Sequence, residues 1–405
     1  MSKLFFLSFL TTGSLSALDI QIDYSFDDNN FFNTAERRNA IEVVADFYGG
    51  ILQDNLLRID SSEFSASSTW TASFINPATG VLNQLSNPII QEDTIIIYVG
   101  SRNLGDFSNT GTTLGQAGAG GISAAGGTSG WITRILGRGQ AGAAFGSEDI
   151  DQITDIGLWG GSIAFNDNED VIWNFSLENN NSGAEFVAVA LHEMAHALGI
   201  GGFAWDNLIV DGVFTGAAAT ASHGSAPPAD TSHFLETLDS PRYGSFATIH
   251  GSPQPSLMQE SRLDTGSNFD VITDLDLAAL VDIGWEVNLP IQFNVVSLSP
   301  SQVSFNWPSN SFLSYELIRT SDLQTPSGAS LVIVGDGTTQ TWNDPAPDPE
   351  TAFYQLEVSS ATSLSTVTTS PPTQSQAKLK SSVEAFETAS IEPQVTTGCS
   401  CGSTH

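Results

Sequence analysis

The sequence predicts an α+β domain followed by a small all-β unit, and three observations support this fold class. Strand-like and helix-like apolar patterns alternate between residues 18 and 289, whereas only strand-like patterns occur between residues 290 and 360. Ser, Thr and Pro dominate residues 361–405 and predict a flexible tail. The 405 residues, 40% hydrophobic and 14% charged, are enough for one large domain and a smaller one.

The N-terminus has the layout of an export signal. Lys3 precedes an apolar run over residues 4–10, and small residues follow up to Ala17. This run is shorter than the roughly 20 apolar residues of a membrane-spanning helix, and no later segment is long enough. We therefore expect residues 1–17 to be a signal peptide and the mature protein to be secreted into the extracellular medium, without an integral membrane segment.

The acidic composition excludes several classes of partner. Acidic residues number 45 against 12 basic ones, and the net charge of −33 repels nucleic-acid phosphates and anionic membrane surfaces. The glycine-rich residues 100–146 contain no G-x-x-x-x-G-K-[ST] phosphate-binding loop. Cys399 and Cys401 are the two cysteines of the chain, so no disulfide framework holds the fold, and we assign this pair no role.

The predicted domain opens with a strand and a helix. Apolar and polar side chains alternate from Ile20 to Phe26, as expected of a half-buried strand. Apolar side chains then recur at helical spacing between Thr34 and Leu57, with an interruption at Gly49-Gly50.

Strands and loops are predicted for the next part of the domain. The β-branched run Thr94–Val99 predicts an interior strand, and residues 100–146 predict a surface loop system because of their glycine content. Short strands are predicted at Ile163–Phe165 and at Val171–Phe175, both bounded by turn-forming residues.

A second helix follows, with clear signals at both ends. Ser182 and Glu185 have the spacing of a capping box, and Gly199 ends the helix. One helical face is lined by Val187, Leu191, Met194 and Leu198.

Residues 290–360 have the residue pattern that is typical of a small β-sandwich. Short alternating segments are separated by Pro, Gly, Asn and Asp, which are turn-forming residues. The predicted strands are Val303–Trp307, Tyr315–Arg319, Ser330–Val334 and Phe353–Val358.

The second helix carries the motif His192-Glu193-Met194-Ala195-His196. The i, i+4 spacing places both imidazoles one turn apart on the same face, where they can bind one metal ion. Glu193 points about a quarter-turn away, so its carboxylate reaches a metal-bound water rather than the metal. Such a motif also arises by chance, but its place at the end of a helix followed by Gly199 favours a zinc site.

Zinc in such a site makes peptide hydrolysis the expected reaction. Zinc with three protein ligands lowers the pKa of its bound water to about 7, and Glu193 then acts as the general base. The same glutamate returns the proton to the leaving amine. The sequence therefore predicts a secreted zinc-dependent endopeptidase that acts on protein or peptide substrates.

The motif resembles a known family. His192-Glu193-x-x-His196-x-x-Gly199 is similar to the start of the metzincin signature. In metzincins with a short spacing, the third histidine ligand would stand at the position of Gly202, so here the third ligand must come from elsewhere. This resemblance implies a metzincin-like catalytic domain, with a mixed twisted sheet and an active-site helix.

Leishmanolysin-like metzincins carry a long insertion before the third histidine. Candidates within such an insertion are His233, His223 and His250, and Asp206 is a further candidate that would need a tight return of the chain. We favour His233 because Thr231-Ser232-His233-Phe234, Ser256-Leu257-Met258 and residues 272–280 resemble the family's ligand, Met-turn and closing helix in order. The resemblance makes Met258 the Met-turn residue.

The resemblance extends over most of residues 18–289. The chain looks like exported bacterial zinc peptidases in the blocks Tyr24–Phe32, Thr94–Gly100, Gly160–Asp167 and Phe186–Leu198. In metzincins the strand before the active-site helix pairs with extended substrate, which implies this role for Gly161–Phe165.

Calcium is a second cofactor that the sequence leaves open. Residues 27–30 and 166–170 are rich in Asp and Asn oxygens of the kind calcium prefers, but neither run matches an EF-hand loop. Solvated turns are the alternative explanation for both runs.

Two alternatives to a peptidase remain open. The first is a cell-surface adhesion or binding protein that keeps the fold and has lost activity, suggested by the absent histidine at Gly202 and the appended β-sandwich, although the intact Glu193 argues against it. A zinc hydrolase acting on a non-peptide amide uses the same metal and base.

Overall fold

The computed structural model describes most of the chain between residues 18 and 360 and a short segment near the C-terminus. The described residues are 18–105, 112–126, 128–140, 155–176, 183–235, 239–240, 242–244, 254–258, 271–287, 294–299, 302–309, 313–320, 329–334, 339–344, 353–360 and 399–403. The predicted signal peptide and nearly all of the predicted tail lie outside these residues. Within them, no helix combines the length and apolar character needed to cross a membrane.

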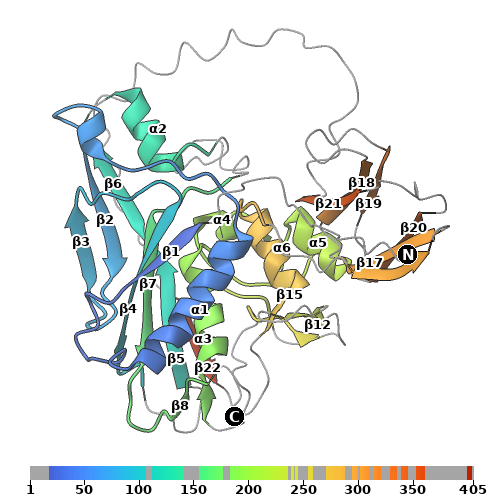
Figure 1. Ribbon diagram of the computed structural model, residues 1–405. Helices are drawn as coiled ribbons and strands as arrows, with labels where there is room; N and C mark the ends of the chain where they lie inside the picture. Colours follow the sequence, from blue (N-terminus) through green and yellow to red (C-terminus); the bar gives the residue numbers. More distant parts are fainter. Residues whose placement is uncertain are drawn as a thin grey trace.

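A five-stranded mixed sheet forms the centre of the molecule (Figure 1). Its order is β1 (Asp19–Asp23), β4 (Thr94–Arg102), β7 (Gly160–Asn166), β5 (Thr112–Ala119) and β22 (Cys399–Ser403). Strands β1, β4 and β7 are parallel, whereas β5 runs antiparallel to β7, and β22 runs antiparallel to β5. The predicted strands at residues 20–26, 94–99 and 163–165 correspond to β1, β4 and β7.

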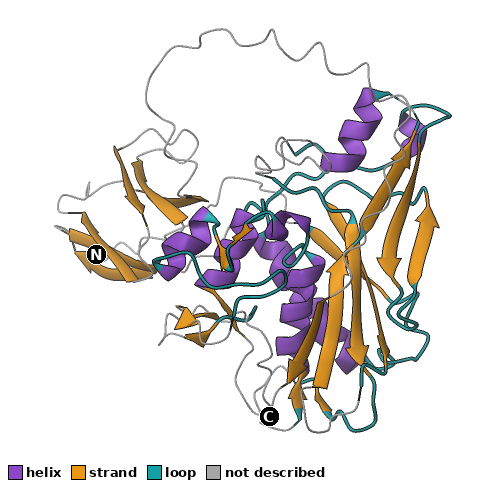
Figure 2. Ribbon diagram, turned by 180° about the vertical axis from the view of Figure 1, so that it is seen from behind, coloured by secondary structure: helices purple, strands orange, loops and turns teal. Residues whose placement is uncertain are grey.

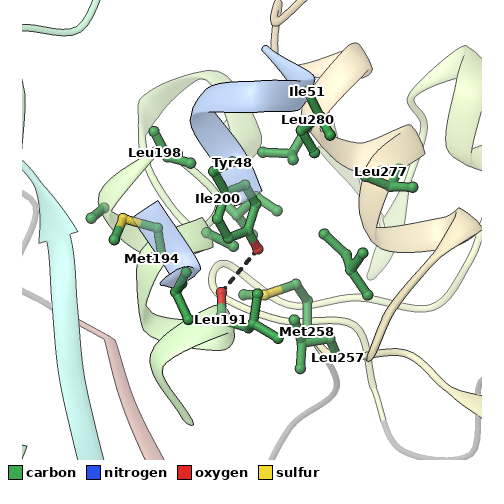
Figure 3. Close-up of a cluster of buried hydrophobic side chains, with 14 of the residues drawn as sticks. Tyr48, Ile51, Leu191, Met194, Leu198, Ile200, Leu257, Met258, Leu277 and Leu280 are labelled. Atoms are coloured by element: carbon green, nitrogen blue, oxygen red, sulfur yellow. Dashed lines mark hydrogen bonds between the residues drawn. The ribbon is translucent and has the colours of Figure 1, made fainter. Parts of the chain in front are cut away.

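Two helices cover one face of this sheet and contact each other (Figure 1). Helix α1 (Ala35–Ile51) begins after Thr34, whose side chain accepts a hydrogen bond from Arg37 N at 3.3 Å. Helix α3 (Phe186–Ala197) packs between α1 and strands β5 and β7. The buried Tyr48 hydroxyl of α1 donates to Leu191 O of α3 at 2.9 Å (Figure 3).

The predicted interruption of the first helix at Gly49-Gly50 is wrong. Helix α1 continues to Ile51, and a Cβ atom at residue 49 would collide with the carbonyl oxygen of Leu18. Leu18 N donates to Gly49 O at 3.1 Å. Glycine is therefore needed here for the close approach of helix and strand, not for a break.

The predicted surface loop system at residues 100–146 is also wrong. These residues contain β5, β6 (Gly121–Ala125) and helix α2 (Ser129–Gly137). Strand β6 joins β2 (Thr69–Ile75) and β3 (Leu82–Ser86) in a separate antiparallel sheet of order β3-β2-β6. A second hydrophobic core lies here, around Trp70, Trp131 and Trp159.

The segments that follow α3 in the sequence fold back to the C-terminal end of that helix. Figure 2, which views the molecule from behind, shows them beside the central sheet. They are helices α4 (Phe203–Asp206), α5 (Ala217–His223) and α6 (Asp274–Asp282), with short strands β10 (Ile209–Val210), β11 (Val213–Phe214), β12 (Asp239–Ser240), β13 (Arg242–Gly244), β14 (Gln254–Pro255) and β15 (Val271–Thr273). Three further short elements precede α3, namely η1 (Ser61–Glu63), β8 (Trp173–Asn174) and β9 (Ala184–Glu185).

The described part of residues 290–360 consists of two three-stranded antiparallel sheets. One has the order β16 (Asn294–Ser299), β17 (Gln302–Pro308), β20 (Thr339–Asp344), and the other β19 (Ala329–Val334), β18 (Leu313–Thr320), β21 (Phe353–Ser360). The four predicted strands lie within β17, β18, β19 and β21. Buried Trp307 and Tyr315 bring the two sheets together, with ring centroids 6.2 Å apart.

Candidate metal centre

Helix α3 begins later than the capping box predicts. Its first residue is Phe186, and Glu185 at the N-cap makes no capping hydrogen bond with its side chain. The Glu185 carboxylate instead accepts from Asn174 Nδ2 at 3.0 Å, beside the parallel pairing of β8 with β9. Ser182 lies outside the described residues. The predicted helix end is confirmed, because the helix stops at Ala197 and Gly199 has a φ of +108°.

Three histidines meet at the C-terminal half of α3. The Nε2 atoms of His192 and His196 are 3.0 Å apart, and those of His233 lie 3.2 Å from His196 and 3.3 Å from His192. All three side chains are buried, with exposed fractions of 2% to 4%. Within the described residues, this is the one group of three or more His, Cys, Asp or Glu side chains that could hold a metal ion.

Backbone carbonyls fix the orientation of two of these rings. His192 Nδ1 donates to Leu257 O at 2.7 Å, and His196 Nδ1 donates to Ile200 O at 2.9 Å. The proton of each ring is thus on Nδ1, and the Nε2 lone pair is directed into the cluster. Burial first, and then a neighbouring imidazole, lowers the pKa of each of the three histidines to about 3, so the rings are neutral at physiological pH.

The donor set fits zinc. Lone pairs on the Nε2 atoms of His192 and His196 face each other at 3.0 Å, which is repulsive unless a cation lies between them. Tetrahedral zinc with Zn–N distances of roughly 2.0–2.1 Å separates its nitrogen ligands by about 3.3 Å, close to the separations found here. Neutral, buried imidazoles oriented by carbonyls are the usual ligands of such an ion.

The third histidine reaches the cluster after an insertion. Gly202 begins helix α4, and the chain returns through β10, β11 and α5. A tight turn then presents His233, because Asp230 Oδ1 accepts from Ser232 N at 2.7 Å and from His233 N at 2.8 Å. Phe234 N donates to Met258 O at 3.0 Å and joins this turn to the predicted Met-turn.

Two of the other candidates for the third ligand, His223 and Asp206, lie outside the cluster. His223 ends helix α5, where its Nδ1 donates to Ser225 O at 3.0 Å. Asp206 is exposed in α4 and is not part of the histidine group. His250 lies outside the described residues.

Asp276 organises the turn that orients His192, a role that sequence reasoning missed. Its carboxylate accepts from the Ser256 hydroxyl, from Leu257 N at 2.9 Å and from Met258 N at 3.0 Å. The same carboxylate completes the capping box of α6 with Thr273. Since Leu257 O accepts the Nδ1 proton of His192, α6 is linked to His192 through one turn. The Thr273-x-x-Asp276 spacing was the available signal.

We expect Asp276→Asn to weaken zinc binding by about 10- to 100-fold, the usual effect of losing support for a ligand. The side-chain amide nitrogen of the variant cannot accept the hydrogen bonds that a carboxylate oxygen of Asp276 accepts in the parent, so the 256–258 turn would lose part of its support. Zinc affinity is measured by competition with a chelator. The matched control is Asp282→Asn on the same helix, which loses hydrogen bonds to Ala218 N and Ala219 N but leaves the 256–258 turn intact. Equal zinc affinity in the two variants would refute this role of Asp276.

Glu193 is buried on α3 and packs against strand β5. A Cβ atom on Gly115 of β5 would lie 2.6 Å from Glu193 Cγ and still closer to Oε1. Glycine at position 115 therefore makes room for the carboxylate. The glycine content of residues 100–146 predicted a surface loop at Gly115, so this contact was not expected from the sequence.

The expected substrate-pairing strand is not available. Residues 161–165 belong to β7, which pairs with β4 on one side and with β5 on the other. Both sets of backbone groups of β7 are thus used within the sheet. The family pattern carried over from the sequence is wrong on this point.

The two acidic turns considered as calcium sites are joined to each other and to neighbouring segments by hydrogen bonds. Asp27 accepts from Phe31 N at 3.0 Å and from Phe32 N at 2.8 Å. Asp167 Oδ2 accepts from Asn29 Nδ2 at 3.1 Å and from Ser101 Oγ at 2.9 Å. These donors give both turns a role in holding neighbouring segments together.

Comparison with protein-family models and with curated proteins gives no match to this chain.

Proposed function

We propose that the protein is an exported zinc-dependent endopeptidase with a metzincin-like catalytic domain and a β-sandwich accessory domain. The observation that carries the proposal is the buried cluster of His192, His196 and His233, with Glu193 on the same helix as two of them. Three histidine ligands would leave a fourth zinc position for water, and Glu193 directly follows the first of them in the sequence, which supports hydrolysis rather than a purely structural metal site.

Each side chain of the site would have a separate role in hydrolysis. His192, His196 and His233 hold the zinc ion, and the carbonyls of Leu257 and Ile200 keep two of these rings aligned. Zinc supplies a Lewis acid for the scissile carbonyl and lowers the pKa of water. Glu193 accepts a proton from the attacking water and delivers it to the leaving nitrogen. Its side chain is buried and packs closely against Gly115 of β5.

The experiment is hydrolysis of casein by the full chain before and after metal removal. We expect activity in the zinc-loaded protein, loss with a chelator and recovery on addition of zinc. Stoichiometric zinc without hydrolysis of casein or of a peptide library would contradict the endopeptidase proposal. That result would favour the adhesion protein or a hydrolase of non-peptide amides.

A further inference from the structure

The last strand of the chain pairs with the strand that packs against Glu193. Strand β22 lies antiparallel on the outer edge of β5, with Cys399 opposite Ala117, Cys401 opposite Gly115 and Ser403 opposite Thr112. Figure 1 shows β22 at this edge, beside β5 and α3. The C-terminal segment thus occupies the outermost position of the central sheet.

The register brings this segment next to the proposed catalytic glutamate. Cys401 pairs with Gly115, and Gly115 is the residue whose missing side chain leaves room for Glu193. Neighbouring strands in a sheet lie about 4.8 Å apart. A strand on the outer edge of β5 therefore runs within one strand spacing of the backbone that contacts Glu193.

Without β22, strand β5 would present a free edge. An edge strand exposes unpaired N–H and C=O groups, and these bind an extended peptide by main-chain hydrogen bonds. Neither partner is charged, since Thr112–Ala119 and residues 394–404 contain no Asp, Glu, Lys or Arg. In a chain with a net charge of −33, this uncharged pairing avoids the repulsion that an acidic segment would meet.

The covalent connection between β22 and the rest of the chain favours the pairing of β5 with this C-terminal segment. Residues 361–398 connect β21 to β22. Because β22 and β5 belong to the same chain, their pairing is intramolecular and has a higher effective concentration than a free peptide. A separate peptide of ordinary affinity must compete with this local concentration.

We propose that residues 399–403 are an autoinhibitory segment, which docks on the outer edge of β5 and blocks the pairing of any other extended peptide strand there. Peptide substrates must displace this segment to lie beside Glu193. The consequence for substrates rests on the proposed peptidase function, whereas the docking itself does not.

The test uses the full zinc-loaded chain carrying Glu193→Gln, so that a probe is not cleaved. The probe is a fluorescent peptide with the sequence of residues 396–405 and serine in place of both cysteines. It is titrated against the parent chain, against S400P/C401P, which removes two adjacent backbone donors of β22, and against the control T396P/T397P, placed outside the strand.

We expect S400P/C401P to bind the probe at least tenfold more tightly than the parent or the control. Hydrogen exchange of the amides of residues 112–119 should also be faster in this variant. A chain terminated after Gly398 serves as the second variant and should behave as S400P/C401P does. Equal probe affinity in the parent and in both variants would overturn the proposal.

Activity separates this inference from the proposed function. If casein is hydrolysed, the rate constant kcat/KM of S400P/C401P should exceed that of T396P/T397P by a similar factor, and equal values would refute displacement by substrate. If no chain hydrolyses casein but the probe binds as expected, the peptidase proposal fails and the docking site stands.

Discussion

Glu193→Gln is expected to reduce peptide hydrolysis by about 10²- to 10⁴-fold while zinc binding is retained, the usual contribution of a general base. Glutamine has nearly the same shape, so it keeps the packing against Gly115 of β5. It cannot accept the proton of the attacking water. The measurement is kcat/KM on a fluorogenic peptide, with the zinc content of the same samples determined by mass spectrometry.

The matched control for this variant is Glu185→Gln. Glu185 lies at the start of the same helix, and its carboxylate accepts from Asn174. We expect the control to keep at least a third of the parent activity. A Glu193→Gln protein that is as active as the control, with equal zinc content, would exclude Glu193 as the base.

His233→Ala is expected to lower zinc affinity by about 10²- to 10³-fold. Zinc-site binding energies of about 10–16 kcal/mol are distributed over four ligands, so one ligand accounts for roughly 2.5–4 kcal/mol. His233 Nε2 lies 3.2 Å and 3.3 Å from the two Nε2 atoms of the helical histidines. The variant leaves those two rings and their carbonyl partners in place. Affinity is measured by competition with a chromogenic chelator at pH 7.5.

His223→Ala is the control, because His223 also lies in the insertion but bonds to Ser225 O outside the cluster. We expect its zinc affinity to equal that of the parent. Should His233→Ala bind zinc as the parent does, the third ligand is a different residue, and His250→Ala becomes the variant to measure.

The sequence was most informative where the residue pattern is local. The helical face and its glycine stop predicted the end of α3, and the i, i+4 spacing predicted that His192 and His196 share one face. His233 could be chosen among three histidines only through a resemblance over several segments, since spacing alone says nothing about where a long insertion returns. The structure places it beside the other two.

Errors arose where tertiary contacts override local composition. Glycines at positions 49 and 115 indicated a break and a loop, but each is required by the close approach of another element. Sequence patterns do not give strand order, so residues 161–165 were expected to pair with substrate although β7 is an internal strand. The role of Asp276 depends on a turn and a helix separated by residues 259–270, a contact that no periodicity reveals.

X-ray absorption at the zinc edge of the zinc-loaded full chain tests the central claim most directly, because it reports the atoms that bind the metal. We expect one zinc ion per chain with three imidazole nitrogens at about 2.0–2.1 Å, one further light-atom ligand and no sulfur. Sulfur scattering at about 2.3 Å, which would indicate Cys399 or Cys401 as a ligand, or the absence of bound zinc, would contradict it.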